Sequence, residues 1–301
     1  MSIADLIPVD VRARLKALRL QARRISGAQG IGQHQSRSRG AGLEFAQYRA
    51  YEPGDEPRQI DWKLYARSDK FFVREAERDS PLVVWCLIDT TASMAQSDAA
   101  RPQWSRLQAA KALTACVIEL ALKQGDRFGL IAVNDSALVI VNAGSGSKHR
   151  DQCLLELHKL KAQGAWPKEA QCRPIWERIA ANTLVLLLSD DYDEACVSLV
   201  ERLAVARREV LSIQILTVEE RDFPFQGGHR FRDAETDTEL LTDAAASRTD
   251  FIEQFATARR TLSLRFAASG INHVEYVLDQ PLDAPLRRFF LPRNTLHQGS
   301  A

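Results

Sequence analysis

Cysteine is scarce in this chain, and its five residues lack the spacing typical of disulfide or zinc-binding cysteines. Their number is odd, no CxxC pair occurs, and most of them lie in apolar helical or strand patterns: Cys86, Cys116, Cys153, Cys172 and Cys196. Neither a disulfide framework nor a zinc site is therefore expected. We expect small buried side chains in a protein that stays in a reducing compartment.

Long apolar runs are also missing. No eighteen consecutive residues are apolar, and Asp5 and Asp10 interrupt the apolar residues at the N-terminus, so the sequence predicts neither a membrane span nor a signal peptide. The 40 basic and 39 acidic residues give a net charge of +1, which excludes a whole-molecule field that attracts nucleic acid or an anionic membrane. We expect a cytoplasmic protein in which any charged patch is local.

Several enzyme signatures are absent from the sequence. There is no GxxxxGK[ST] phosphate loop and no HExxH motif, and the string GAQGIG does not follow a predicted strand. None of the six histidines has a spacing that pairs it with a serine or cysteine nucleophile. These absences favour a non-enzymatic protein, and any ATP used in its pathway must be hydrolysed by another protein.

The first 42 residues have the composition of a basic arm. Residues 9–25 predict a basic amphipathic helix, and the glycine- and serine-rich residues 26–42 follow it. Eight Arg or Lys stand against two Asp in residues 1–42. Such an arm contacts an acidic partner or nucleic acid, or else its leucines pack on the main body; the sequence leaves both alternatives open.

The remainder, residues 43–301, is predicted to be one α/β domain. Apolar strand-like runs such as PLVVWCLID and NTLVLLLSD alternate with helical periods over 105–124, 195–209 and 250–270. Continuous apolar runs indicate strands buried on both faces, because parallel strands need helical crossovers. We therefore expect a doubly wound, mostly parallel sheet with helices on both faces.

Two acidic residues end the most apolar of these strands. Asp89 is followed by the hydroxyls of Thr91 and Ser93, and Asp190 ends a later strand. In a sheet of 3-2-1-4 order those two strands are neighbours, and ligands collect at that switch point. Hard oxygen ligands suit Mg²⁺ or Mn²⁺. The sequence therefore predicts a metal site made by Asp89, Thr91, Ser93 and Asp190.

Two other interpretations of these residues stay open. Hydroxyl residues after a strand often cap the next helix, and a terminal Asp can simply accept backbone N–H bonds. A strand-terminal Asp also begins metal-dependent phosphohydrolases of the haloacid dehalogenase type, in which a second Asp two residues later is the general acid. Thr91 stands at that position here, which disfavours the hydrolase.

The D-x-T-x-S pattern of residues 89–93 resembles the metal-ion-dependent adhesion site of von Willebrand factor type A domains. That resemblance implies a type A-like fold and assigns Asp190 to the late Asp of the motif. The sequence departs from the motif at the later Thr, where it reads Gly164-Ala165-Trp166. The implied metal site is thus incomplete.

A second resemblance covers most of the chain. Residues 42–79, GLEFAQYRAYEPGDEPRQIDWKLYARSDKFFVREAERD, and the later FRDAETDTELLTD resemble the bacterial "domain of unknown function fifty-eight" family. Membership implies a partner, a MoxR-type AAA+ ATPase, with which the protein would assemble or activate client proteins. The resemblance thus implies a protein-interaction adaptor. A divalent ion at the predicted metal site would keep open positions, so we expect a metal-dependent site that docks a carboxylate of the ATPase or of a client.

The signature segment also has a physical interpretation of its own. Charged and aromatic residues alternate at Arg58, Asp61, Trp62 and Arg67. One interpretation is that these residues stabilise the segment through ion pairs and a packed ring. The other is that they form a surface that binds a partner, since Trp and Arg are enriched at binding hot spots.

Overall fold

The computed structural model describes residues 6–22, 45–52, 57, 60–76, 81–233, 235–236 and 238–291. The chain forms two compact units, of which one contains Met1–Gln29 and Leu82–Ala301 and the other Gly30–Pro81. This division differs from the expected boundary after residue 42. The N-terminal helix belongs with the large unit because its apolar side chains are buried there, whereas the signature segment forms a unit of its own.

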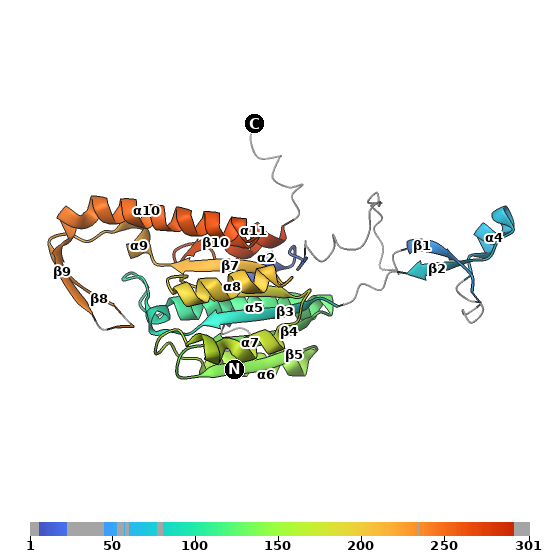
Figure 1. Cartoon of the computed structure of the whole chain (residues 1–301), viewed down its shortest axis with the longest axis horizontal. Helices are drawn as coiled ribbons and strands as arrows, with labels where there is room; N and C mark the ends of the chain where they lie inside the picture. The colour runs from blue at the N-terminus through green and yellow to red at the C-terminus, as the bar shows by residue number, and fades with distance from the viewer. Residues whose placement is uncertain are drawn as a thin grey trace, which may run out of the picture. The chain divides into compact units, whose positions relative to one another are not determined.

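The large unit is built on one six-stranded sheet (Figure 1). Its strands are β3 (Val83–Asp89), β4 (Arg127–Val133), β5 (Leu138–Gly144), β6 (Leu184–Ser189), β7 (Glu209–Leu216) and β10 (Asn272–Val277). They lie in the order β10-β7-β6-β3-β4-β5, and all neighbours are parallel except β4 and β5. The predicted doubly wound sheet is confirmed, and β3 lies beside β6 as expected.

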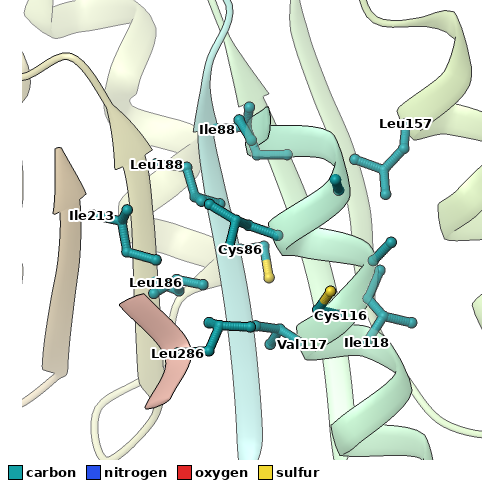
Figure 2. Close-up of a cluster of buried hydrophobic side chains, with 14 of the residues drawn as sticks. Cys86, Ile88, Cys116, Val117, Ile118, Leu157, Leu186, Leu188, Ile213 and Leu286 are labelled. Atoms are coloured by element: carbon teal, nitrogen blue, oxygen red, sulfur yellow. The ribbon is translucent and has the colours of Figure 1, made fainter. Parts of the chain in front are cut away.

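Helices cover both faces of this sheet because alternate side chains of its strands point to opposite sides. On β3, Cys86 and Ile88 join one buried cluster, while Trp85 and Leu87 join the other. The first cluster, part of which Figure 2 shows, includes side chains of α2 (Val9–Leu15), α5 (Arg106–Gln124), α6 (Ser147–Lys159) and α11 (Ala284–Phe290). The second includes side chains of α7 (Arg173–Arg178), α8 (Glu194–Val205) and α10 (Ala244–Ala268).

The N-terminal helix is shorter than predicted and is packed on the large unit. It ends at Leu15, although the sequence predicts a helix over residues 9–25. Val11, Leu15, Leu18 and Leu20 are buried in the first cluster, so the leucines of the arm pack on the main body. The remainder of the predicted arm, residues 23–42, lies outside the described residues.

A hairpin that the sequence did not predict lies between β7 and α10. The short helix α9 (Val218–Asp222) precedes it, and β8 (Gly228–Arg232) pairs antiparallel with β9 (Glu239–Asp243). These two strands form a sheet of their own, and their side chains are mostly exposed. Figure 1 shows the hairpin beyond the end of the main sheet at which β3 terminates.

The small unit contains the described part of the signature segment. Its strands β1 (Phe45–Ala50) and β2 (Phe72–Ala76) pair antiparallel. Helix α4 (Trp62–Ser68) lies between them in the chain, and Asp61 caps its start by accepting hydrogen bonds from the backbone N–H groups of Lys63 and Leu64. Tyr65 stacks on Phe71, with 4.5 Å between ring centroids.

Removal of the Asp61 cap is expected to loosen α4. Asp61→Ala should lower the stability of this helix by about 1 kcal/mol, because two backbone N–H groups lose their acceptor. Asp61→Asn is the matched control, since its side-chain oxygen can accept the same bonds. Hydrogen exchange of residues 62–68 measures the difference, and equal protection in the two variants would contradict the capping role.

All five cysteines are buried and free of disulfide bonds, as the sequence predicts. Across the described ranges, no helix combines the length and apolar character needed to cross a membrane.

Candidate functional site

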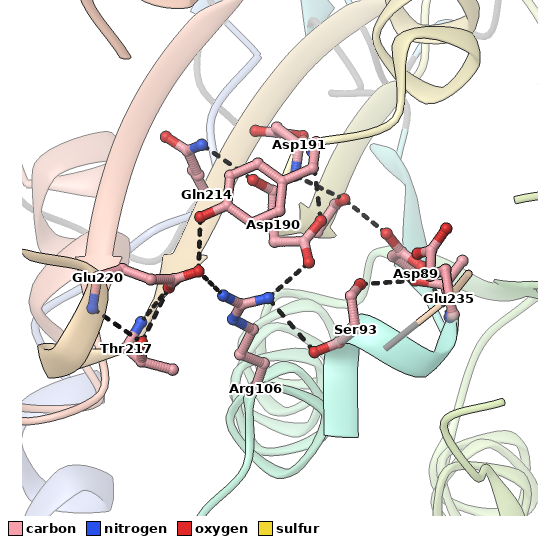
Figure 3. A network of polar contacts seen from close by, with 12 residues as sticks. Asp89, Ser93, Arg106, Asp190, Asp191, Gln214, Thr217, Glu220 and Glu235 are labelled. Carbon is pink, nitrogen blue, oxygen red and sulfur yellow. Dashed lines mark hydrogen bonds and ion pairs between the residues drawn. The ribbon is translucent and has the colours of Figure 1, made fainter. Parts of the chain in front are cut away.

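The candidate site lies at the switch point between β3 and β6. Val84 to Ile88 of β3 pair in parallel register with Leu184 to Leu188 of β6, so Asp89 and Asp190 follow the two strands at the same edge of the sheet. Both residues are 2% exposed. This register confirms the prediction that the two strands bring the acidic residues together. Figure 3 shows Asp89 and Asp190 side by side.

Asp89 is held by neutral donors. One carboxylate oxygen accepts a hydrogen bond from the Thr91 backbone N–H at 2.9 Å, and the other accepts one from the Ser189 hydroxyl at 2.7 Å. Burial and the nearby charge of Asp190 raise the pKa of Asp89 to about 7 despite these bonds. No positive side chain forms an ion pair with Asp89 among the described residues, so its negative charge is poorly compensated.

The loop after β3 presents two hydroxyls. Thr91 precedes the short 3-10 helix Ala92–Ala95, and its hydroxyl oxygen lies 3.0 Å from that of Ser93. The loop in which the motif would have its later Thr supplies a backbone group here, because the Gly164 carbonyl accepts a hydrogen bond from the Ala92 N–H at 2.8 Å. This contact fixes the loop but adds no hydroxyl ligand.

Arg106, a residue that the sequence reasoning missed, binds Asp190 directly. It lies in the first turn of α5 and is completely buried. Its Nη1 donates to Asp190 Oδ2 at 2.6 Å and to the Ser93 carbonyl at 3.3 Å. Its Nη2 pairs with Glu220 of α9. Asp190 is thus held by an arginine, which differs from the expectation that it shares a metal cation with Asp89.

Glu220 and Tyr192 complete this ion-pair network. The Tyr192 hydroxyl donates to Glu220 Oε1 at 2.7 Å, and the Arg106 guanidinium lies 5.4 Å from the centre of the Tyr192 ring. Burial opposes ionisation of Glu220, yet Arg106 and Tyr192 outweigh it and its pKa lies below the ordinary value. The described part of this network carries one buried guanidinium between two carboxylates.

Asp191 is a second poorly compensated carboxylate. Its backbone lies in the left-handed region with φ of 58°, and its Oδ2 accepts a hydrogen bond from the Ser212 hydroxyl at 3.0 Å. Burial raises the pKa of Asp191 to about 7, and burial lowers the pKa of the neighbouring His273 to about 4. The imidazole is therefore neutral at pH 7 and does not offset the carboxylate charge.

A further carboxylate reaches the site from the β8–β9 hairpin. Glu235, at the hairpin tip, is half-buried, and Figure 3 shows it beside Asp89 and Ser93. Burial and the charge of Asp190 raise its pKa, while hydrogen bonds with the side chains of Thr91 and Ser93 act in the opposite direction. The only advance sign of this residue was the resemblance of FRDAETDTELLTD to a family motif.

The oxygen donors fit a divalent cation in part. Asp89, Thr91 and Ser93 are hard ligands of the kind that Mg²⁺ and Mn²⁺ prefer, and Asp89 has no ion-pair partner among the described residues. Asp190 is engaged by Arg106. Within the described ranges no three His, Cys, Asp or Glu side chains are grouped as metal ligands. Metal binding at these residues stays a prediction.

The predicted partner surface lies on the small unit. Asp61 is buried and caps α4, whereas Trp62 is 57% exposed and Arg67 is exposed. Arg58 lies outside the described residues. Trp62 also makes an edge contact with Tyr65, with 6.1 Å between ring centroids. A role of these residues in binding a partner stays a prediction.

The sheet order, the antiparallel edge strand and the oxygen-rich loop at the switch point define a von Willebrand factor type A-like α/β protein. The family model described as "Protein of unknown function DUF58" matches residues 47–261, and the chain belongs to this family.

The chain is also similar to several curated proteins and solved structures. Uncharacterized proteins Rv1480 of Mycobacterium tuberculosis and Mb1516 of Mycobacterium bovis are each 26% identical over 298 residues, covering 96% of this chain and 92% of theirs. Similar solved structures include the hypothetical protein BatB from Bacteroides thetaiotaomicron (12% identity, TM-score 0.43) and the VWA domain of SpRpn10 (13% identity, TM-score 0.40). Each covers 69% of this chain, which covers 95% of each of them.

Proposed function

We propose that this protein is a non-enzymatic interaction adaptor that docks a carboxylate of a partner protein at the end of β3. The observation that carries the proposal is Glu235, because Figure 3 shows the carboxylate side chain of this residue beside Asp89 and Ser93. A site that holds a carboxylate of its own hairpin at the end of β3 has the space for one from a partner.

The chemistry of docking follows from the site's donors. The Thr91 and Ser93 hydroxyls are hydrogen-bonded to each other, so one of them keeps a proton that it can donate to the incoming carboxylate. Hydrogen bonds to a charged acceptor are stronger than neutral ones. Arg106 donates a hydrogen bond to Asp190, the other strand-terminal carboxylate of the site. A bound Mg²⁺ or Mn²⁺ would supply the positive charge that the buried Asp89 lacks, and Asp89, Thr91 and Ser93 are the residues that would hold it.

The groups around Asp89 form no catalytic set in the part of the chain that the structure describes, which supports a binding role. Both oxygens of Asp89 accept hydrogen bonds within the protein, and Thr91 stands where a haloacid dehalogenase-type hydrolase would need its acid. Among the described residues, the histidine near this site, His273, contacts Asp191 and Ser212 rather than Asp89.

The proposed partner is a MoxR-type AAA+ ATPase, with which the adaptor assembles or activates client proteins in the cytoplasm. Membership of the DUF58 family supports this partner through the resemblance given above. Five free, buried cysteines are in keeping with a reducing compartment.

A binding titration with the MoxR-type ATPase of the same organism tests the proposal. Wild-type protein in Mg²⁺ should bind it, and Asp89→Ala should weaken binding by about tenfold or more, equivalent to about 1.4 kcal/mol, because the variant lacks the carboxylate that would hold the cation. EDTA should weaken binding for the same reason. Asp222→Ala, which removes an exposed carboxylate of α9, is the matched control. If binding is indifferent to both Asp89→Ala and EDTA, the proposed site is wrong.

A further inference from the structure

An apolar groove lies between the β8–β9 hairpin and α10, within the large unit. Its volume of about 730 Å³ is within the range of ligand-binding pockets, about 300–1,000 Å³. Part of its lining, Tyr192 and Glu220, also belongs to the ion-pair network around Arg106. The groove is therefore next to the candidate site at the end of β3. Six aromatic side chains line it: Tyr192, Phe223, Phe225, Phe231, Phe251 and Phe255.

The two walls of the groove are apolar because of the spacing of their residues. Phe231 of β8 and Leu240 of β9 are paired across the hairpin, so their side chains lie on the same face of it. Phe251 and Phe255 are four residues apart on α10 and share one face of the helix. Phe223 contacts Phe231 and Phe251, with 5.7 Å and 4.5 Å between ring centroids. These ring contacts join the two walls at the base of the groove.

The groove leaves apolar surface exposed to water. Leu240 lines the groove, yet it is 62% exposed. The hairpin to which it belongs forms a two-stranded sheet of its own, and such a hairpin is at best marginally stable in water. A contiguous exposed apolar surface with a polar rim is typical of an interaction site. An apolar ligand that covers Leu240 would remove this surface from water.

The charge of the groove favours a positively charged occupant. The described lining contains two carboxylates, Glu219 and Glu220, and no lysine or arginine. One oxygen of Glu219 accepts a hydrogen bond from the Ala99 N–H at 2.8 Å, whereas the other is buried and has no hydrogen-bond partner among the described residues. Glu220 shares the guanidinium of Arg106 with Asp190. One cation thus faces two carboxylates there, and Glu219 adds a further negative charge.

We propose that this groove binds a segment of a partner protein that presents large apolar side chains together with a lysine or arginine. The apolar side chains pack between the hairpin wall with Leu240 and the phenylalanines of α10, and the basic side chain pairs with Glu219. Apolar burial supplies most of the affinity, and the charge selects the partner. This surface is separate from the proposed carboxylate site, and the inference does not depend on that site.

Selection from a phage-displayed library of short random peptides tests the proposal. The full-length wild-type protein is the target, and peptides that also bind the Leu240→Ser variant are removed. The enriched peptides should combine aromatic or aliphatic residues with a net positive charge. A library that yields no enriched peptides, or enriched peptides without lysine and arginine, would overturn the proposal.

The affinity of an enriched peptide for four variants tests the two parts of the groove separately. Leu240→Ser and Glu219→Gln should each weaken binding by about threefold or more. Leu241→Ser is the control for the first, because Leu241 is 76% exposed but lies on the opposite face of the hairpin. Asp222→Asn is the control for the second, because it removes an exposed carboxylate of the same helix. Both controls should bind as the wild type does, and wild-type affinity of Leu240→Ser or Glu219→Gln would overturn the proposal.

Sedimentation of the wild-type protein identifies a different occupant, a second copy of this chain. A monomer is expected, whereas a dimer that Leu240→Ser dissociates and Leu241→Ser does not would overturn the proposal. The Asp89→Ala variant should bind the enriched peptide as tightly as the wild type does. Failure of the carboxylate site would therefore appear in the titration with the ATPase and leave peptide binding unchanged.

Discussion

Replacing Arg106 with methionine is expected to lower the free energy of unfolding by about 3–5 kcal/mol, the usual cost of breaking a buried ion pair by removing one partner. The guanidinium is completely buried and contacts both Asp190 and Glu220. Methionine fills a similar volume but leaves two carboxylates without their cation. Chemical denaturation of the purified protein measures the loss.

Arg265 provides a matched control for this prediction. It also bridges two carboxylates, Glu194 at 2.7 Å and Glu201 at 2.8 Å, but its side chain is 37% exposed. Water screens such a pair, so Arg265→Met should cost only about 0–1 kcal/mol. If the two arginine variants lose equal stability, the buried network does not have the importance for folding that its geometry indicates.

The Asp89→Asn variant is expected to be more stable than the wild type at pH 8 in the absence of divalent cations. Burial and Asp190 raise the pKa of Asp89 to about 7 from its ordinary value of 3.8. At a pH between these two pKa values, Asp89 keeps a proton in the folded protein that it has lost in the unfolded chain. The free energy of unfolding therefore falls as the pH rises from about 4 to about 7, and this contribution is constant above that range.

Asparagine has no proton to lose. The free energy of unfolding of Asp89→Asn should therefore lack the decrease with rising pH that Asp89 causes in the wild type. Its stability advantage over the wild type should grow between pH 5 and pH 8 by an amount on the order of 2 kcal/mol. Asp222→Asn is the control, because Arg221 lowers the pKa of this exposed carboxylate and it stays ionised over the whole interval. If the difference in the free energy of unfolding between Asp89→Asn and the wild type does not change with pH, the surroundings of Asp89 do not raise its pKa.

The main sheet was predictable because its signals are local in the sequence. The runs that end at Asp89 and Asp190 are too apolar for a surface strand, and the helical periods along the chain favour parallel crossovers. Their adjacency then followed from the switch-point rule, and the observed order confirms it. Helix α5 was predicted within one residue of its observed start at Arg106.

The network around the site was not predictable in the same way. Arg106, Glu220 and Glu235 are far apart in the sequence, and each occurs in a stretch in which a charged residue is ordinarily solvent-exposed. One available signal was the position of Arg106 in the first turn of an otherwise apolar helix, because a basic residue there is unfavourable near the helix N-terminus unless an acid compensates it. Glu235 gave no physical signal, since its role depends on a hairpin whose strands are short and mostly exposed.

The length of the N-terminal helix was mispredicted for a different reason. Basic amphipathic periodicity continues through residue 25, yet the helix ends at Leu15. Leu20 continues in a non-helical segment, where its backbone N–H donates to the Gln124 side chain at 2.8 Å. A tertiary contact with the end of α5 thus overrides a local helical preference, which is a weak determinant on its own.

The measurement that tests the central claim most directly is the affinity of the MoxR-type ATPase for a Thr91→Val, Ser93→Ala double variant. These changes remove the two hydroxyls that receive the carboxylate and leave Asp89, Arg106 and the sheet unchanged. The account predicts binding at least about tenfold weaker than that of the wild type, with the free energy of unfolding changed far less than by Arg106→Met. Wild-type affinity in the double variant would contradict a docking site at the end of β3.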